Sequence, residues 1–149
     1  MKVRNRISFL FFIGIFIAGS TALGYYYFFV YNPPLKAAAA FMDAMEARNE
    51  EALRSTIIIS TGPDDEKLRP PTDSDIRLLL SQPFPRGRIL DQRKREGATR
   101  DYFYLVYREP DGRIYAMVAT KVDGGFRIVI PETPRSKRHR YLWDYTWTN

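Results

Sequence analysis

The hydrophobic pattern changes twice along this chain, from one continuous apolar run to helical spacing and then to strict alternation. The first run covers residues 7–31, ISFLFFIGIFIAGSTALGYYYFFVY, 25 residues without a charged side chain. A helix rises about 1.5 Å per residue and the hydrocarbon core of a bilayer is about 30 Å thick, so about 20 apolar residues are enough to cross it. In lipid every backbone polar group must be paired within the segment, which a helix achieves. The run therefore predicts one transmembrane helix.

The charges that flank this run predict its orientation. Lys2, Arg4 and Arg6 lie in the basic segment 1–6, whereas the next basic residue after the run is Lys36. An excess of lysine and arginine marks the cytoplasmic side of a membrane helix. We therefore expect an inner (cytoplasmic) membrane protein with a cytoplasmic amino terminus and a periplasmic or extracellular domain.

A cleaved signal peptide is the alternative interpretation of the run. Residues 18–22 contain small-x-small patterns that resemble cleavage sites. The apolar residues nevertheless continue to Val30, well past the 7–15 residues that are typical of the apolar part of a signal peptide. An uncleaved anchor is the favoured interpretation.

Small residues within the run suggest where another helix would pack. Ser20 and Gly24 are four positions apart and match the small-xxx-small pattern of packed membrane helices, and Gly14 offers a further small position. We expect Gly14, Ser20 and Gly24 to form a helix-docking face in the membrane. Ordinary tolerance of glycine in membrane helices is the alternative.

Helical spacing begins after the apolar run. Asn32-Pro33-Pro34 is expected to end the membrane helix, because proline disfavours helix in the residue before it. Residues 35–56 have apolar side chains three and four positions apart and predict a long helix, with a possible break at residues 48–50. Residues 57–59 are three isoleucines, which fit either a buried strand or the end of this helix. A short helix is expected at 74–82, with Thr72 or Asp73 as its N-cap.

Alternation of apolar and polar residues then predicts four strands, at residues 88–95, 101–109, 113–122 and 126–130. Pro110-Asp111-Gly112 and Asp123-Gly124-Gly125 are typical hairpin turns between them. Such a sheet needs a helix over one face. Residues 35–131 thus predict a small two-layer α+β domain, in which the long helix packs on a curved, four-stranded antiparallel sheet.

This order of elements resembles the NTF2-like (cystatin-like) superfamily, and most of all its small, exported, membrane-tethered members. Residues 34–45 and 48–53 resemble the opening helix of that superfamily, and residues 111–118 and 122–128 resemble its closing hairpin. The resemblance implies a cone-shaped domain that Phe126 would plug.

Enzymes of the superfamily use Asp, His and Tyr inside the cone. The only histidine here is His139, in the C-terminal tail, so the sequence does not support a histidine acid–base mechanism inside the fold. Asp43 with Tyr102 or Tyr104 could line a pocket, although a solvated Asp43 beside packing tyrosines is the favoured interpretation. We expect a non-catalytic protein without a bound cofactor or metal.

Composition limits the remaining possibilities. The chain has no cysteine, which excludes disulfides, thiolate metal sites and a lipid-modified cysteine. Its formal net charge is +6, of which residues 1–6 contribute +3 and residues 132–149 contribute +2. Basic ends around a nearly neutral body favour contact with a membrane or a protein partner and argue against nucleic acid.

The tail, residues 132–149, combines basic and aromatic side chains. Such residues are common anchors at membrane surfaces and protein interfaces. We expect partner or membrane-surface contacts from Arg135, Lys137, Arg138, Arg140, Tyr141, Trp143, Tyr145 and Trp147. Packing of the tail on its own domain is an equally good alternative.

Taken together, these features predict an accessory or assembly subunit of a larger membrane complex that acts through protein–protein contacts with other membrane subunits. Photosynthetic, respiratory and secretion complexes all fit this description. The alternative is a membrane-tethered domain that binds a small ligand in the cone, or less plausibly an enzyme. A deep apolar pocket with converging polar groups would favour the alternative.

Overall fold

The computed structural model describes residues 2–62, 67–95, 100–136 and 138–144. The chain forms two compact units, Met1–Pro33 and Pro34–Asn149. The first unit contains α1 (Lys2–Tyr26) and the π-helix η1 (Tyr27–Tyr31). Within α1, Ser8–Tyr26 is long and apolar enough to span a membrane. The chain therefore carries one N-terminal helix of the kind predicted.

Helical conformation does not end at the two prolines, contrary to the prediction. Helix α2 (Asn32–Glu46) begins at Asn32, so that Pro33 and Pro34 lie in its first turn. Proline is tolerated there because the N–H groups of a first turn have no partner within their helix. The N–H of Asn32 bonds to the carbonyl of Tyr27, five residues earlier, which is the wider spacing of a π-helix.

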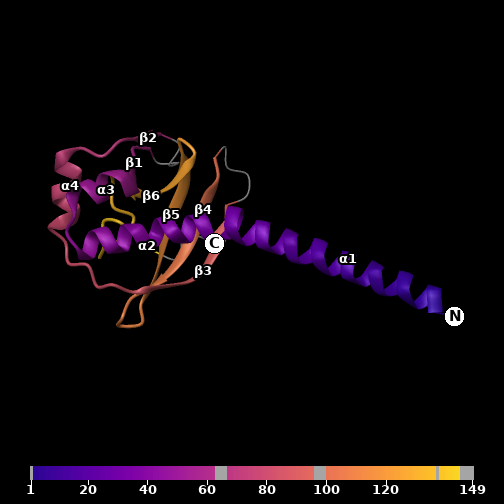
Figure 1. Ribbon diagram of the computed structural model, residues 1–149. Coiled ribbons are helices and arrows are strands. Elements are labelled where there is room, and N and C mark those ends of the chain that lie inside the picture. Colours follow the sequence, from indigo (N-terminus) through magenta and orange to yellow (C-terminus); the bar gives the residue numbers. More distant parts are fainter. Residues whose placement is uncertain (1, 63–66, 96–99, 137, 145–149) are drawn as a thin grey trace. The chain divides into compact units, whose positions relative to one another are not determined.

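The second unit contains a mixed sheet, larger than the four-stranded antiparallel sheet that was predicted. The strand order is β2-β1-β6-β5-β4-β3, and β7 also pairs with β5 (Figure 1). The strands are β1 (Ile57–Ser60), β2 (Leu68–Arg69), β3 (Arg88–Lys94), β4 (Tyr102–Arg108), β5 (Ile114–Val122), β6 (Gly125–Pro131) and β7 (Trp143–Asp144). The four predicted strands form its antiparallel part, from β3 to β6.

The isoleucine run is a strand, which settles the alternative left open by the sequence. β1 lies parallel to β6, with Ile57 opposite Ile128 and Ile59 opposite Ile130. All four residues of β1 are buried. Strands buried on both faces are continuously apolar, so β1 shows no alternation from which its pairing could have been predicted.

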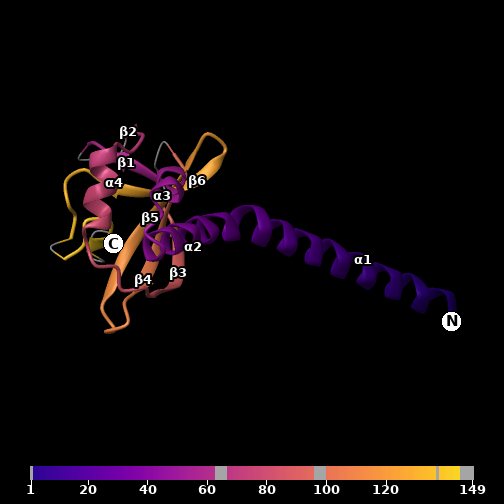
Figure 2. The same cartoon turned by 60° about the vertical axis from the view of Figure 1, so that its left-hand side comes forward.

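Three helices accompany the sheet (Figures 1 and 2). α2 is followed by α3 (Glu50–Thr56) and later by α4 (Asp73–Leu80). The predicted break between the first two is confirmed: Arg48 has a φ of 52°, and the Asn49 side chain accepts a hydrogen bond from the Ala52 N–H at 3.0 Å. Asparagine is a favoured N-cap because it satisfies an amide that the first turn leaves unpaired.

In β4, alternate residues lie on opposite faces of the sheet, as the predicted alternation requires. Leu105 and Tyr107 pack in the main core with residues of α2, α3 and α4. Tyr102, from the same strand, belongs to a smaller cluster with Val118 and Trp143. Neighbouring residues of a strand point to opposite faces, so the sheet buries apolar side chains on both sides.

Candidate functional site

The described part of the C-terminal tail folds back on the domain. Its β7 pairs with Tyr115 and Ala116 of β5, whereas β6 pairs with the other end of that strand. The Arg140 N–H also donates to the side chain of Gln82 at 3.1 Å, two residues after the end of α4. The tail therefore packs on its own domain, which was one of the two alternatives.

Two aromatic residues predicted to contact a partner are instead inside the domain. Tyr141 is fully buried and Trp143 is 3% exposed. That prediction is wrong for both, because their apolar rings complete the two clusters of the core. Tyr141 lies against Phe41 of α2 and Phe84, with ring centroids 5.8 and 5.6 Å away. These rings fill the space between α2 and the sheet.

Basic residues of the tail also make contacts within the domain. Arg140 donates to the Glu132 carbonyl at 2.8 Å, and Arg138 lies 3.4 Å from the Asp111 carboxylate. The Arg138 side chain is 44% exposed and so could also reach a partner. Lys137, Tyr145 and Trp147 lie outside the described residues.

His139 is buried with Glu109 at the end of β4. Its Nε2 contacts Glu109 Oε1, and the two side chains are 4% and 1% exposed. The single histidine therefore lies inside the fold, because the tail packs on the domain. Arg138 Nε lies 3.9 Å from the other carboxylate oxygen of Glu109. A buried carboxylate needs such partners, since an isolated charge in the interior is very costly.

Tyrosines surround this pair. The Tyr115 and Tyr141 rings lie 5.2 and 5.3 Å from the imidazole of His139. Burial raises the pKa of Tyr115 and Tyr141, and it raises that of Tyr107 to about 12. Desolvation disfavours the phenolate, so all three stay protonated at neutral pH. The cluster is therefore a packed polar core around one acid–histidine pair.

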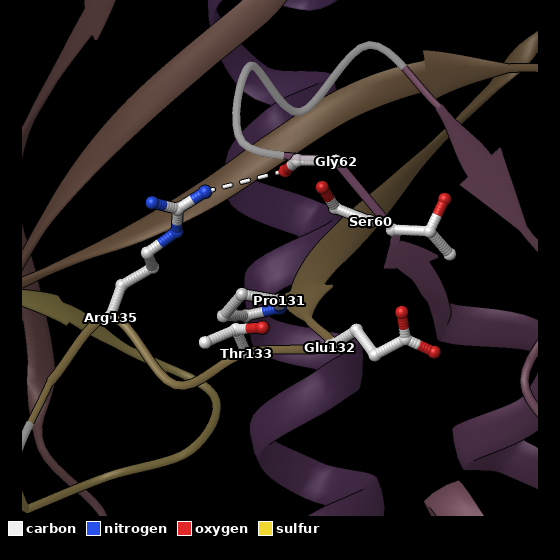
Figure 3. A pocket seen from close by; sticks show the side chains of 7 residues that line it. Ser60, Gly62, Pro131, Glu132, Thr133 and Arg135 are labelled. Atoms are coloured by element: carbon white, nitrogen blue, oxygen red, sulfur yellow. Dashed lines mark hydrogen bonds between the residues drawn. The ribbon is translucent and has the colours of Figure 1, made fainter.

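A hollow of about 270 Å³ opens beside the start of the tail (Figure 3). The Arg135 guanidinium donates to the Gly62 carbonyl at 3.3 Å. The Glu132 carboxylate points to the other side of the hollow and pairs with Arg69 at 3.0 Å. Both charged residues of this hollow, Glu132 and Arg135, thus already have partners within the domain.

A second hollow, of about 460 Å³, lies where the chain enters β3 and leaves β4. It is lined by Arg86, Gly87, Arg88, Arg108, Glu109, Pro110 and Gly112. Arg86 pairs with Asp43 at 2.7 Å and with Glu46 at 2.5 Å, which raises the pKa of its guanidinium. No sequence motif marks this site, because Arg86 and Arg88 lie just before and at the start of β3 whereas Arg108 ends β4.

The remaining predicted residues are placed as follows. Gly14 and Gly24 lie in α1 with open space around them, and Ser20 is exposed. Phe126 is half-buried, and its ring packs edge-on against Phe103 at 5.5 Å. The role of a plug predicted for Phe126 fits the fully buried Tyr141 better.

The possible pocket of Asp43 with Tyr102 or Tyr104 is not formed. Asp43 is exposed and pairs with Arg86, whereas the two tyrosines belong to the cluster on the other face of the sheet. Among the residues that the structure describes, no group of three or more histidine, aspartate or glutamate side chains could hold a metal ion.

Comparison with known proteins adds no assignment. No family model, curated protein or solved structure matches this chain.

Proposed function

We propose that this chain is a single-pass membrane protein that serves as a non-catalytic accessory or assembly subunit of a membrane complex. The distribution of apolar surface carries the proposal. Among the described side chains of α1, every large hydrophobic one is exposed, and Phe16 reaches 76%. In the described part of the domain only Leu78, Leu90 and Ile114 are exposed large hydrophobic residues. The surface that needs an apolar environment is thus concentrated in α1.

The filled interior supports a role without a small ligand between α2 and the sheet. Binding sites for small molecules are usually concave and apolar, with a few polar groups aimed into them. Here Tyr141, Phe41 and Phe84 occupy the space where a ligand would lie in a cone-shaped domain. Membership of the NTF2-like superfamily is part of the same proposal, supported by the helix α2 that packs over the antiparallel part of the sheet.

The proposed topology has a cytoplasmic amino terminus and a periplasmic or extracellular domain. The basic residues Lys2, Arg4 and Arg6 before α1 support it. Because the chain has no cysteine, Ser74→Cys at an exposed position of α4 creates a unique thiol. A membrane-impermeant maleimide should label this thiol in intact cells or spheroplasts. Labelling only after lysis would reverse the proposed topology.

Gentle detergent extraction followed by sizing tests the subunit role. We expect the chain to co-migrate in fixed stoichiometry with a larger membrane complex that survives washing. In α1 the double variant Ser20→Leu/Gly24→Leu should release it, because leucine prevents close approach of a partner helix. Ala22→Leu is the matched control on the opposite side of the helix and should remain bound. Migration of the wild-type chain alone, as a monomer or dimer, would contradict the role.

A further inference from the structure

The hollow at the start of β3 brings two arginines together. Arg88 and Arg108 lie directly opposite each other in the β3–β4 ladder. Both are exposed, and neither forms an ion pair or a side-chain hydrogen bond with another residue in the described part of the chain. Like charges that face each other across a ladder destabilise it. An anion between the two guanidinium groups would remove this repulsion.

The other charges around the hollow are already engaged. The third arginine, Arg86, is held by Asp43 and Glu46. Glu109 is the only acid among the lining residues, and its carboxylate is buried against His139 and Arg138. An incoming anion could therefore bind Arg88 and Arg108, neither of which pairs with a described acid. The Glu109 carboxylate would repel it little, because Arg138 and His139 already lie against it.

The floor of the hollow is held in place. A Cβ atom on Gly87 would lie 2.0 Å from the Arg108 carbonyl oxygen, so only glycine allows the two backbones to approach this closely. The Tyr107 hydroxyl accepts a hydrogen bond from the Gly87 N–H at 2.7 Å and donates one to the Pro85 carbonyl at 2.6 Å. These contacts fix the segment from Pro85 to Arg88 against β4, and preorganisation of this kind lowers the cost of binding.

The opposite rim of the hollow is a turn. Gly112 has a φ of +90°, and a Cβ placed on it would lie 4.0 Å from the Arg108 guanidinium. The guanidinium of Arg108 therefore lies beside the turn, at the edge of the hollow. The hollow thus has arginine on adjacent strands, a glycine floor and a glycine at its rim.

We propose that this hollow binds a phosphate-type oxyanion between Arg88 and Arg108. Guanidinium groups match phosphate because their planar forks donate paired hydrogen bonds to its oxygens, and two of them balance a dianion. The same chemistry is offered by free phosphate, or a small phosphomonoester, and by the phosphate of a lipid headgroup. The site does not depend on the proposed subunit role.

The test uses the full chain in nanodiscs of digalactosyl diacylglycerol, a lipid without phosphate, titrated with inorganic phosphate at constant ionic strength. The Nε–Hε NMR signals of the arginine side chains report binding. We expect saturable shifts at Arg88 and Arg108. Arg88→Gln or Arg108→Gln should weaken binding by about tenfold or more, as expected for loss of a charged hydrogen-bond donor. A second arm replaces part of the lipid with phosphatidylglycerol and adds no phosphate, so shifts in this arm alone identify a headgroup as the source.

Arg93→Gln is the matched control, since it removes the same charge from an exposed position of the same strand. It should change binding by less than about twofold, because separated surface charges are largely screened. The proposal would be overturned if all three variants weakened phosphate binding equally. It would also be overturned if the arginine signals did not saturate, or did not shift in either arm. Melting temperatures no lower than that of the wild type confirm that the variants are folded, and the wild-type titration tests the site without any variant.

Discussion

Tyr107 and Tyr141 are both buried rings that carry a hydroxyl, but only one hydroxyl is hydrogen-bonded. Tyr107 bonds to Gly87 and Pro85, whereas the Tyr141 hydroxyl has no hydrogen-bond partner among the described residues. Loss of a satisfied buried hydroxyl leaves its partners unpaired, while loss of an unsatisfied one removes a penalty. Tyr107→Phe should lower the free energy of unfolding by about 1–3 kcal/mol. Tyr141→Phe should leave it unchanged or raise it.

Thermal unfolding in detergent, followed by near-ultraviolet circular dichroism, measures both variants. Each substitution removes the same single atom from a buried ring, so the two serve as controls for each other. Equal losses of stability would mean that the Tyr141 hydroxyl does have a partner.

At the scale of elements, α4 depends on Asp75. The Thr72 side chain and Asp75 form a capping box at the start of the helix, and Asp75 also pairs with Arg69 at 2.7 Å. Arg69 in turn reaches Glu132, so one arginine joins β2, α4 and the tail. The hydrogen bond from Arg69 holds the pKa of Asp75 well below its usual range. This carboxylate therefore stabilises the folded state while it is ionised.

The lowered pKa of Asp75 predicts how the stability of the domain depends on pH. Because the folded-state pKa of Asp75 is depressed, its contribution is complete above the unfolded value of about 4 and is lost as the pH falls below it. Asp75→Asn should cost about 1–3 kcal/mol at neutral pH and flatten the loss of stability in acid. Asp91→Asn is the control, since Asp91 is exposed and lies 3.7 Å from its partner Arg93. Acid unfolding curves measure both, and parallel curves for wild type and Asp75→Asn would contradict the assignment.

At the scale of the whole molecule, the tail is part of the domain. Tyr141, Leu142 and Trp143 are all buried, and β7 covers a stretch of β5 that β6 leaves unpaired. A chain that ends after Pro134 should expose this core and become sensitive to limited proteolysis throughout the domain. A chain that ends after Asp144 keeps the described contacts and should resist the protease as the wild type does. Equal resistance of the two truncated chains would mean that the domain closes without the tail.

Local patterns predicted the elements well but not their partners. The apolar run, the break at Asn49 and the alternating faces of β4 and β5 each follow from side chains within one segment. The parallel pairing of β1 with β6 was missed, because an isoleucine run has no alternation that marks a partner. His139 was placed in the tail, for which packing on the domain was one of two alternatives, and no local pattern pairs it with Glu109.

The amino-acid sequence by itself determined the membrane-type helix, the helices of the domain and the four strands β3 to β6. Hydrophobic periodicity acts over a few residues, so it is visible without a structure. Only the tertiary structure decided that the tail completes the core, that Glu109 meets His139, and that Arg88 faces Arg108. These contacts join residues that are distant in sequence. They depend on the register of the strands and on how the tail packs on the domain, which no local pattern specifies.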